Sequence, residues 1–234
     1  MSVLRFSIDP FITFITDRNV RAPFFAPFMS YYDPAESVSR HRRNLPHWQQ
    51  DDVWVFATWR LGDALPVSKL NALRNERDAW RILHPAPWDA ETEEEYHERF
   101  THRVDKWLDQ GMGSCVLREE KNARIVYDAL LHFHGERYCL DCFVVMPNHV
   151  HVLFSLAESF SLDKVMKSWK GFTSREINKR MKKKGNLWQE EYWDRLIRSE
   201  KHFYKVRSYI LDNPAKANLK DGFLLWTGET DPEP

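Results

Sequence analysis

The spacing of hydrophobic and polar positions predicts four strands in the middle and C-terminal parts of the chain. Residues 53–61 are rich in β-branched and aromatic side chains, which favours a strand. Residues 137–147 and 149–156 have the same character, and the tight turn at Asn148 between them predicts a β-hairpin. Residues 187–197 alternate enough to predict a fourth strand.

Capping residues and helical spacing predict five helices. They are 68–83, 92–110, 119–134, a helix that begins at Ser161, and 199–213. We expect the last helix to end at Asn213, because Pro214 disfavours the α conformation of the residue before it.

The resulting order is strand, three helices, strand, strand, helix, strand, helix. Without two helices of the first crossover this is β-α-β-β-α-β, the ferredoxin-like arrangement. We therefore predict an α+β fold: one antiparallel sheet with helices on one face, extra helices inserted in the first crossover, and a further helix at the C-terminal end. The predicted organisation is an N-terminal extension (1–36), one domain (37–220) with a helical insertion at about 84–135, and a C-terminal tail (221–234).

The charges of the chain are segregated although the formal net charge is zero. Residues 161–220 carry 16 Lys and Arg against 7 Asp and Glu, while residues 88–110 carry 8 acids against 3 bases. Because phosphate binding is local and electrostatic, the basic segment favours contact with nucleic acid. Two ordinary solvated faces are the alternative interpretation.

The composition indicates a cytoplasmic protein. No run of about 18 apolar residues predicts a membrane span, and the short apolar stretch at 11–15 is bracketed by charges, unlike a signal peptide. The three cysteines are sparse, as expected in a reducing compartment. Cys139 and Cys142 would point to opposite faces of a strand, so we interpret them as ordinary strand cysteines.

The clearest candidate for chemistry is the pair His149 and His151. On a strand both imidazoles project to one face, about 7 Å apart along the chain from the ~3.4 Å rise per residue, so they can share a metal ion. Such a pair also occurs by chance. A second copy, His132 and His134, is predicted at a helix end, where residues two apart diverge by about 200°, and is interpreted as structural.

The last helix supplies a second candidate. Tyr209 and Asn213 are one turn apart and flank its apolar stripe, so they can reach one point on an adjoining sheet. A tyrosine beside an apolar stripe is more often a packing residue with a solvated hydroxyl. His202 and Lys205 on the same helix add polar and cationic groups.

Together these segments resemble the REP-associated tyrosine transposases, which are bacterial single-tyrosine HUH enzymes related to the insertion-sequence-200 transposases. The resemblance rests on residues 146–153 (MPNHVHVL), 169–178 (WKGFTSREIN), 187–189 (LWQ) and 209–217 (YILDNPAKA), and on 45–50 with 54–65. It covers roughly residues 40–220.

The resemblance implies a set of roles. His149 and His151 would bind Mg²⁺ or Mn²⁺, Asn213 would complete the metal shell, and Tyr209 on the C-terminal helix would be the nucleophile. The substrate would be single-stranded DNA that carries palindromic repeat hairpins. Lys205 and His202 are candidates to activate the tyrosine, and Trp188 or Trp193 could stack bases. The predicted phosphate contacts are Lys179, Arg180, Lys182, Lys183, Lys184, Arg195, Arg198 and Lys205.

Two other functions stay open at this point. A non-catalytic nucleic-acid-binding protein would use the basic helix and leave the histidines structural. A replication initiator or relaxase of the HUH class would share the chemistry. We expect a monomer rather than a dimer, and no membrane partner.

Overall fold

The computed structural model describes residues 30–42, 46–85 and 88–228. Its main sheet has five antiparallel strands in the order β6-β3-β5-β4-β7. The strands are β3 (Trp54–Arg60), β4 (Tyr138–Val145), β5 (His149–Leu156), β6 (Trp193–Leu196) and β7 (Leu224–Thr227), and a separate hairpin consists of β1 (Ser39–Arg42) and β2 (Pro46–Gln49). The order of β6, β3, β5 and β4 is compatible with the predicted ferredoxin-like arrangement.

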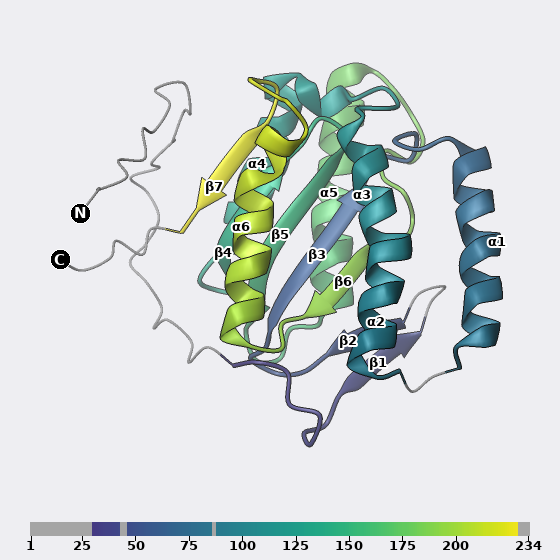
Figure 1. The fold of residues 1–234 in the computed structure, drawn as a ribbon. Helices are drawn as coiled ribbons and strands as arrows, with labels where there is room; N and C mark the ends of the chain where they lie inside the picture. The colour runs from purple at the N-terminus through teal and green to yellow at the C-terminus, as the bar shows by residue number, and fades with distance from the viewer. Residues whose placement is uncertain (1–29, 43–45, 86–87, 229–234) are drawn as a thin grey trace, which may run out of the picture.

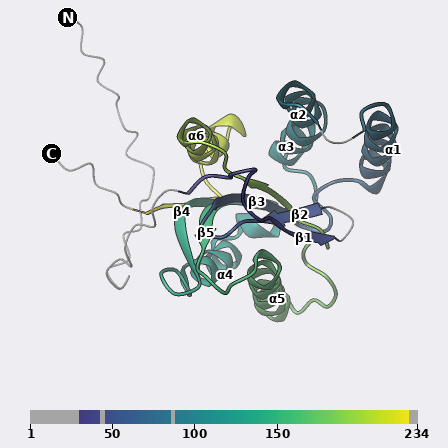
Figure 2. The same cartoon turned by 90° about the horizontal axis from the view of Figure 1, so that it is seen from below.

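The helices form two layers, one on each face of the sheet (Figures 1 and 2). They are α1 (Val67–Leu83), α2 (Ala90–Tyr96), the π-helix η1 (His97–Thr101), α3 (His102–Asp109), the 3₁₀-helix η2 (Val116–Arg118), α4 (Glu120–Leu131), α5 (Leu162–Met181) and α6 (Glu200–Lys216). α4 and α5 cover one face, as predicted, while α6 and α3 cover the other. The expectation of helices on one face only is therefore wrong.

Both faces of the sheet are apolar enough to need a cover. Val150, Val152 and Phe154 point into a core shared with α4 and α5. On the other face, Phe56 and Leu153 pack in a second core with the apolar stripe of α6. Because burying apolar area on both faces is favourable, α6 forms a layer of its own rather than joining α4 and α5.

The helical insertion differs from the predicted range 84–135. The extra helices are α1 to α3, whereas α4 returns to the sheet as the crossover helix, with Val126 and Leu130 in the core. The single helix predicted over 92–110 is divided into α2, η1 and α3. The π-helical turn η1 adds one residue per turn and shifts the faces of the helix on either side of it.

Three predicted boundaries are corrected. The fourth strand was expected over 187–197, but only Trp193–Leu196 forms a strand. The segment expected as a tail from residue 221 contains β7, which pairs with β4. The last helix runs past Pro214 to Lys216, because a proline removes only its own N–H and Ala217 N–H still donates to Asn213 O at 3.0 Å.

Part of the predicted N-terminal extension packs on the domain. The Tyr32 N–H donates to Ile197 O at 2.8 Å, and the Asp33 N–H donates to Gln50 Oε1 at 2.9 Å. Residues 1–29 lie outside the described residues. No helix in the described ranges is long and apolar enough to cross a membrane.

Candidate metal and tyrosine site

Strand β5 places His149 and His151 on the sheet face that α6 covers. The two side chains are 1% and 0% exposed, and their ring centroids lie 4.6 Å apart. The neighbours Val150 and Val152 point into the opposite core. The period of two along the strand therefore brings both imidazoles together, as predicted.

Asn148 fixes the protonation of His149. The Asn148 Nδ2 donates to the carbonyls of Leu108 and Met112, at 3.1 Å each, so its Oδ1 is left as an acceptor. That oxygen lies 2.7 Å from His149 Nδ1, which must then carry the proton. The His149 Nε2 consequently presents a lone pair, the form that a metal ligand needs.

Thr58 lies beside His151 Nδ1 as Asn148 lies beside His149 Nδ1. Thr58 and His151 are direct cross-strand partners in the β3–β5 register, and Thr58 Oγ1 lies 2.7 Å from His151 Nδ1. A hydroxyl can accept the proton of that nitrogen, which leaves Nε2 free to ligate. Each imidazole thus has an outer partner that orients its ring.

Helix α6 brings Tyr209 and Asn213 onto these imidazoles. The Tyr209 ring centroid lies 5.3 Å from that of His151 and 5.9 Å from that of Phe56. Asn213 is 1% exposed and adjoins both His149 and Tyr209. The i, i+4 spacing predicted from the sequence is retained because α6 is helical over both positions.

Several buried polar atoms of this cluster lack a hydrogen-bond partner among the described residues. They are His149 Nε2, His151 Nε2, the Tyr209 hydroxyl and both polar atoms of the Asn213 amide. Buried polar atoms are nearly always satisfied, so this group of exceptions indicates that something else binds there. Two imidazole lone pairs and an amide oxygen fit a divalent cation. No cluster of three or more His, Cys, Asp and Glu side chains with metal-binding placement occurs in the described ranges.

Burial keeps both imidazoles neutral. It lowers the pKa of His149 to about 3, an effect that Asn213 partly opposes. Burial, and after it the neighbouring His149, holds the pKa of His151 well below its ordinary value. Neutral imidazoles are the form that binds metal ions.

A cleft of about 320 Å³ opens beside Tyr209, between α6, β6 and the inserted helices. Its walls carry Arg195, Arg198 and Lys205, three of the predicted phosphate contacts, together with Trp193 and His202. Lys205 also pairs with Glu94 of α2 at 3.6 Å. The acidic insertion therefore forms one wall of the cleft and the basic segment the other.

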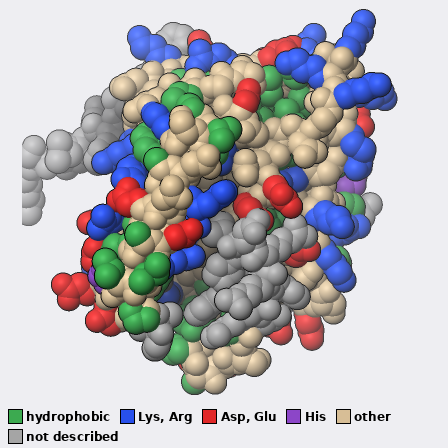
Figure 3. Space-filling view, turned by 90° about the vertical axis from the view of Figure 1, so that its right-hand side faces the viewer, with side chains coloured by type: hydrophobic (Ala, Val, Ile, Leu, Met, Phe, Trp, Pro, Cys, Tyr) green, Lys and Arg blue, Asp and Glu red, His purple; other side chains and the backbone are tan. Residues whose placement is uncertain are grey.

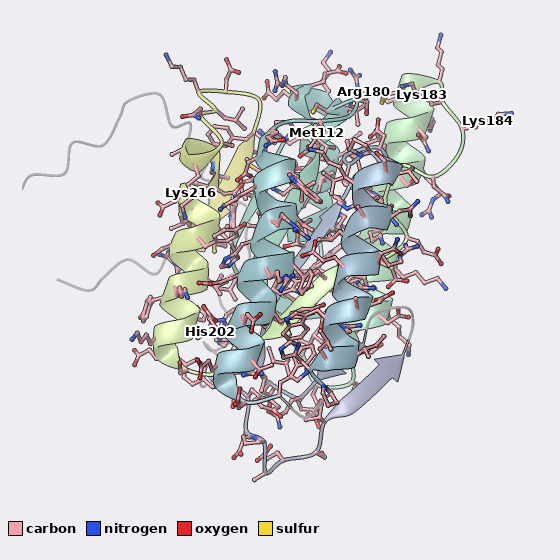
Figure 4. The ribbon with its side chains drawn as sticks, turned by 45° about the vertical axis from the view of Figure 1, so that its right-hand side comes forward. Met112, Arg180, Lys183, Lys184, His202 and Lys216 are labelled. Carbon is pink, nitrogen blue, oxygen red and sulfur yellow. The ribbon has the colours of Figure 1, made fainter. Side chains whose placement is uncertain are left out.

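The remaining predicted phosphate contacts lie elsewhere. Lys179 and Lys182 to Lys184 are exposed at the C-terminal end of α5, and Lys183 and Lys184 lie far from His202 in Figure 4. Figure 3 shows Lys and Arg side chains gathered along the edge of the molecule on which α5 lies. The predicted set thus forms two separate basic surfaces.

Arg180 differs from its neighbours on α5. It pairs with Glu119 and donates to Asn122 Oδ1 at 3.1 Å. Its guanidinium therefore ties α5 to the start of α4.

Two other predicted residues have structural surroundings. Trp188, a predicted base-stacking residue, is buried because apolar residues of α5 and β3 pack over it, and its Nε1–H donates to Thr173 Oγ1 at 2.9 Å. His134 Nδ1 accepts the Leu140 N–H at 3.0 Å. The second His-x-His motif is therefore part of a turn, in agreement with the structural interpretation.

Sequence reasoning missed Thr58 and Asp105. Thr58 could be identified only from the register between β3 and β5, which no local pattern encodes. Asp105 lies in the insertion and lines the cleft beside Tyr209. Sequence analysis considered the acidic residues of 88–110 only through their net charge, so this carboxylate was not singled out. Asn148 was expected as a turn residue, and its side-chain role was not predicted.

Comparison with known proteins finds a family model that matches part of the chain. Residues 131–213 match the family model described as transposase, IS200-like. This segment contains both histidines, Tyr209 and Asn213, so the predicted resemblance is confirmed over it.

Two solved structures are similar to the chain. One is a REP-associated tyrosine transposase bound to a REP hairpin, with 16% identity, 76% of this chain and 73% of that chain covered, and a TM-score of 0.36. The other is a candidate transposase from Deinococcus radiodurans R1, with 15% identity, coverages of 69% and 90%, and a TM-score of 0.29. At these scores the likeness carries no functional weight. Among curated proteins there is no match.

Proposed function

On the premise that residues 131–213 are related to the IS200-like transposases, we propose that this protein cuts and rejoins single-stranded DNA with Tyr209 as the nucleophile. The observation that supports this most directly is the convergence of unpaired polar atoms. The Tyr209 hydroxyl, two imidazole Nε2 atoms and the Asn213 amide are buried together without hydrogen-bond partners in the described structure.

His149, His151 and Asn213 would hold a divalent cation, Mg²⁺ or Mn²⁺ in the family. When bound, such an ion polarises a phosphoryl oxygen and orients the scissile phosphate. Imidazole ligands also suit zinc or nickel, so the choice of magnesium rests on the resemblance. Asn is one methylene shorter than the Gln found in related enzymes, and a ligating Oδ1 would satisfy one of its two unpaired atoms.

Tyr209 would attack phosphorus and form a 5′-phosphotyrosine, while the bond from phosphorus to the 3′ oxygen breaks and leaves a free 3′-OH. The covalent bond conserves the phosphodiester energy, so the strand can be rejoined without ATP. Phe56 packs edge-on against the Tyr209 ring and restricts its orientation. Orientation of this kind lowers the entropic part of the barrier.

The substrate would be a single strand that carries a palindromic repeat hairpin. The cleft beside Tyr209 offers Arg195 and Arg198 for phosphates and Trp193 for stacking on a base. The lysines at the end of α5 form a second basic surface, at a distance from the cleft, that could track a hairpin stem. We expect the protein to act in the cytoplasm as a monomer.

A cleavage assay tests the function. Oligonucleotides with a repeat hairpin beside a single-stranded segment, taken from the DNA that flanks the native gene, would be incubated with Mg²⁺ or Mn²⁺ and compared with blunt duplexes. Cleavage restricted to the folded single strand, and abolished by a chelator, supports the proposal. Tight binding without cleavage under any metal would favour the non-catalytic alternative, and equal cleavage of duplex would contradict the substrate assignment.

The replication-initiator or relaxase alternative shares this chemistry, including the rejoining of strands, so it is tested by the substrate. A transposase of this kind should cleave strands that carry the repeat hairpins flanking the native gene. Cleavage that requires a replication or transfer origin and not the repeat hairpin would favour the initiator or relaxase interpretation.

A further inference from the structure

Asp105 is the carboxyl group that adjoins the Tyr209 hydroxyl. It projects from α3 of the insertion into the cleft that Tyr209 lines from α6. The contact is close enough for each group to affect the ionisation of the other, but the hydroxyl is not in hydrogen-bond geometry in this structure. Catalytic hydrogen bonds are often long before substrate binds.

The Tyr209 hydroxyl has to lose its proton to become a nucleophile. A phenol has an ordinary pKa of about 10, so it carries its proton at neutral pH. It needs a proton acceptor at the hydroxyl itself.

The two groups that sequence analysis suggested for this task are engaged elsewhere. Lys205 is exposed, pairs with Glu94, and as an ammonium group accepts no proton. The His202 Nδ1 accepts the Arg198 N–H at 3.2 Å. Burial and nearby cations lower the pKa of His202 to about 4, so it is a weak base.

The geometry points to Asp105 as the general base that removes the Tyr209 proton during strand cleavage and returns it during rejoining; this rests on the proposed function. In cleavage, the proton moves from the phenol to the carboxylate, the tyrosine oxygen bonds to phosphorus, and the 3′ oxygen leaves and takes a proton from solvent. In rejoining, a 3′-OH releases its proton to solvent and attacks phosphorus, the phosphotyrosine bond breaks, and the carboxylic acid of Asp105 protonates the departing phenolate.

The ionisation of Asp105 suits this task. Burial raises its pKa to about 7, with a smaller opposing effect of Tyr209 and an additional increase from Asp109. A base whose pKa lies near the working pH transfers protons in both directions at useful rates. The charged and titratable groups that share its cleft or adjoin it are Tyr209, Lys201, His202 and Lys205 of α6, Arg195 of β6, Arg198 between β6 and α6, Asp109 and His102 of α3, His97 of η1, and Glu94 of α2.

The test is Asp105→Asn, which keeps the shape of the side chain and removes the base. The expected result is a loss of about 10²–10⁴-fold in the rate of Tyr209–DNA adduct formation, with unchanged affinity for a hairpin oligonucleotide. The wild-type rate should rise with pH through about 7, since the base form accumulates above the pKa of Asp105, and the variant should lose this rise. Asp109→Asn, the same change one turn along α3, is the matched control; it should keep most of the rate and still show the rise with pH, displaced to lower pH because Asp109 no longer raises the pKa of Asp105.

A second variant separates a base from a merely structural carboxylate. Incorporation of a fluorinated tyrosine at position 209 lowers the pKa of the phenol and should restore adduct formation in the Asp105→Asn background. A wild-type rate and pH profile in Asp105→Asn, or a loss that the fluorinated tyrosine does not restore, overturns the inference. The absence of any adduct in the wild-type protein would instead count against the proposed function.

Folding is checked by thermal unfolding. A buried carboxylate with a raised pKa binds its proton more tightly in the folded state, so its ionisation destabilises the fold as pH rises from the unfolded value toward 7. Asp105→Asn should therefore unfold at the same or a higher temperature near neutral pH. A lower unfolding temperature together with the loss of activity would indicate a structural role and contradict the inference.

Discussion

The two faces of strand β5 carry opposite chemistry on the same backbone. Val150, Val152 and Phe154 face α4 and α5 in a core whose energy comes from apolar burial and ring packing. His149 and His151 face α6, where buried nitrogen atoms lack partners in the described structure. A buried polar atom without a partner costs free energy. One face therefore stabilises the fold, and the other retains polar groups at the expense of stability, as functional sites do.

The largest effect on activity is expected from the polar face. His151→Ala or His149→Ala leaves one imidazole and should abolish cleavage, because a site with a single imidazole loses most of its metal affinity. In thermal unfolding, Mn²⁺ should raise the Tm of the wild-type protein but not that of the variants. His132→Ala, from the second His-x-His motif, is the control and should change neither cleavage nor the effect of Mn²⁺ on the Tm. An equal loss of cleavage in His132→Ala would show that the two motifs were assigned wrongly.

The largest effect on stability is expected from the apolar face. Phe154 is fully buried and its ring packs 5.1 Å from that of Trp169. Phe154→Ala should lower the free energy of unfolding by about 3–5 kcal/mol, while folded protein at low temperature still binds Mn²⁺. Loss of metal binding in protein that is still folded, as judged by circular dichroism, would mean that the two faces are not independent.

The sequence predicted those features of the two faces that follow from local periodicity, and not those that depend on contacts distant in sequence. The alternation along 149–156 placed the histidines and valines on opposite faces, and the i, i+4 relation paired Tyr209 with Asn213. Local periodicity is sufficient for both. The β7 strand and the layer formed by α6 and α3 depend on contacts distant in sequence, such as the pairing of Val144 with Leu225. No local rule encodes such pairings.

An intermediate effect is expected at Thr58, which orients His151 from β3. Thr58→Val keeps the volume of the side chain and removes the hydroxyl, so metal affinity should fall about 10–100-fold. Thr173→Val is the matched control on the other face, where the hydroxyl donates to Trp169 O. Calorimetric titration with Mn²⁺ measures the metal affinity of the two variants. Similar affinity in both would exclude a role for Thr58 in orienting the imidazole.

The smallest effect is expected at the end of α5. Charge reversal of Lys182, Lys183 and Lys184 should weaken hairpin binding and make it less sensitive to salt. The slope of the logarithm of the binding constant against the logarithm of the salt concentration should become shallower by about 0.7–0.9 for each lost phosphate contact. Reversal of Lys164 and Lys167, exposed toward the other end of the same helix, is the control. If both sets weaken binding equally, the effect is one of net charge rather than of a defined surface.

The most direct measurement is identification of the residue that becomes attached to DNA. The wild-type protein would be incubated with a hairpin-bearing single strand and Mn²⁺, and the covalent adduct digested and sequenced by mass spectrometry. The expected result is a nucleotide on the peptide that contains Tyr209, and no adduct in Tyr209→Phe, whose fold should be unchanged because the ring is retained. An adduct on Tyr192 or Tyr204, or cleavage that persists in Tyr209→Phe, would contradict the account.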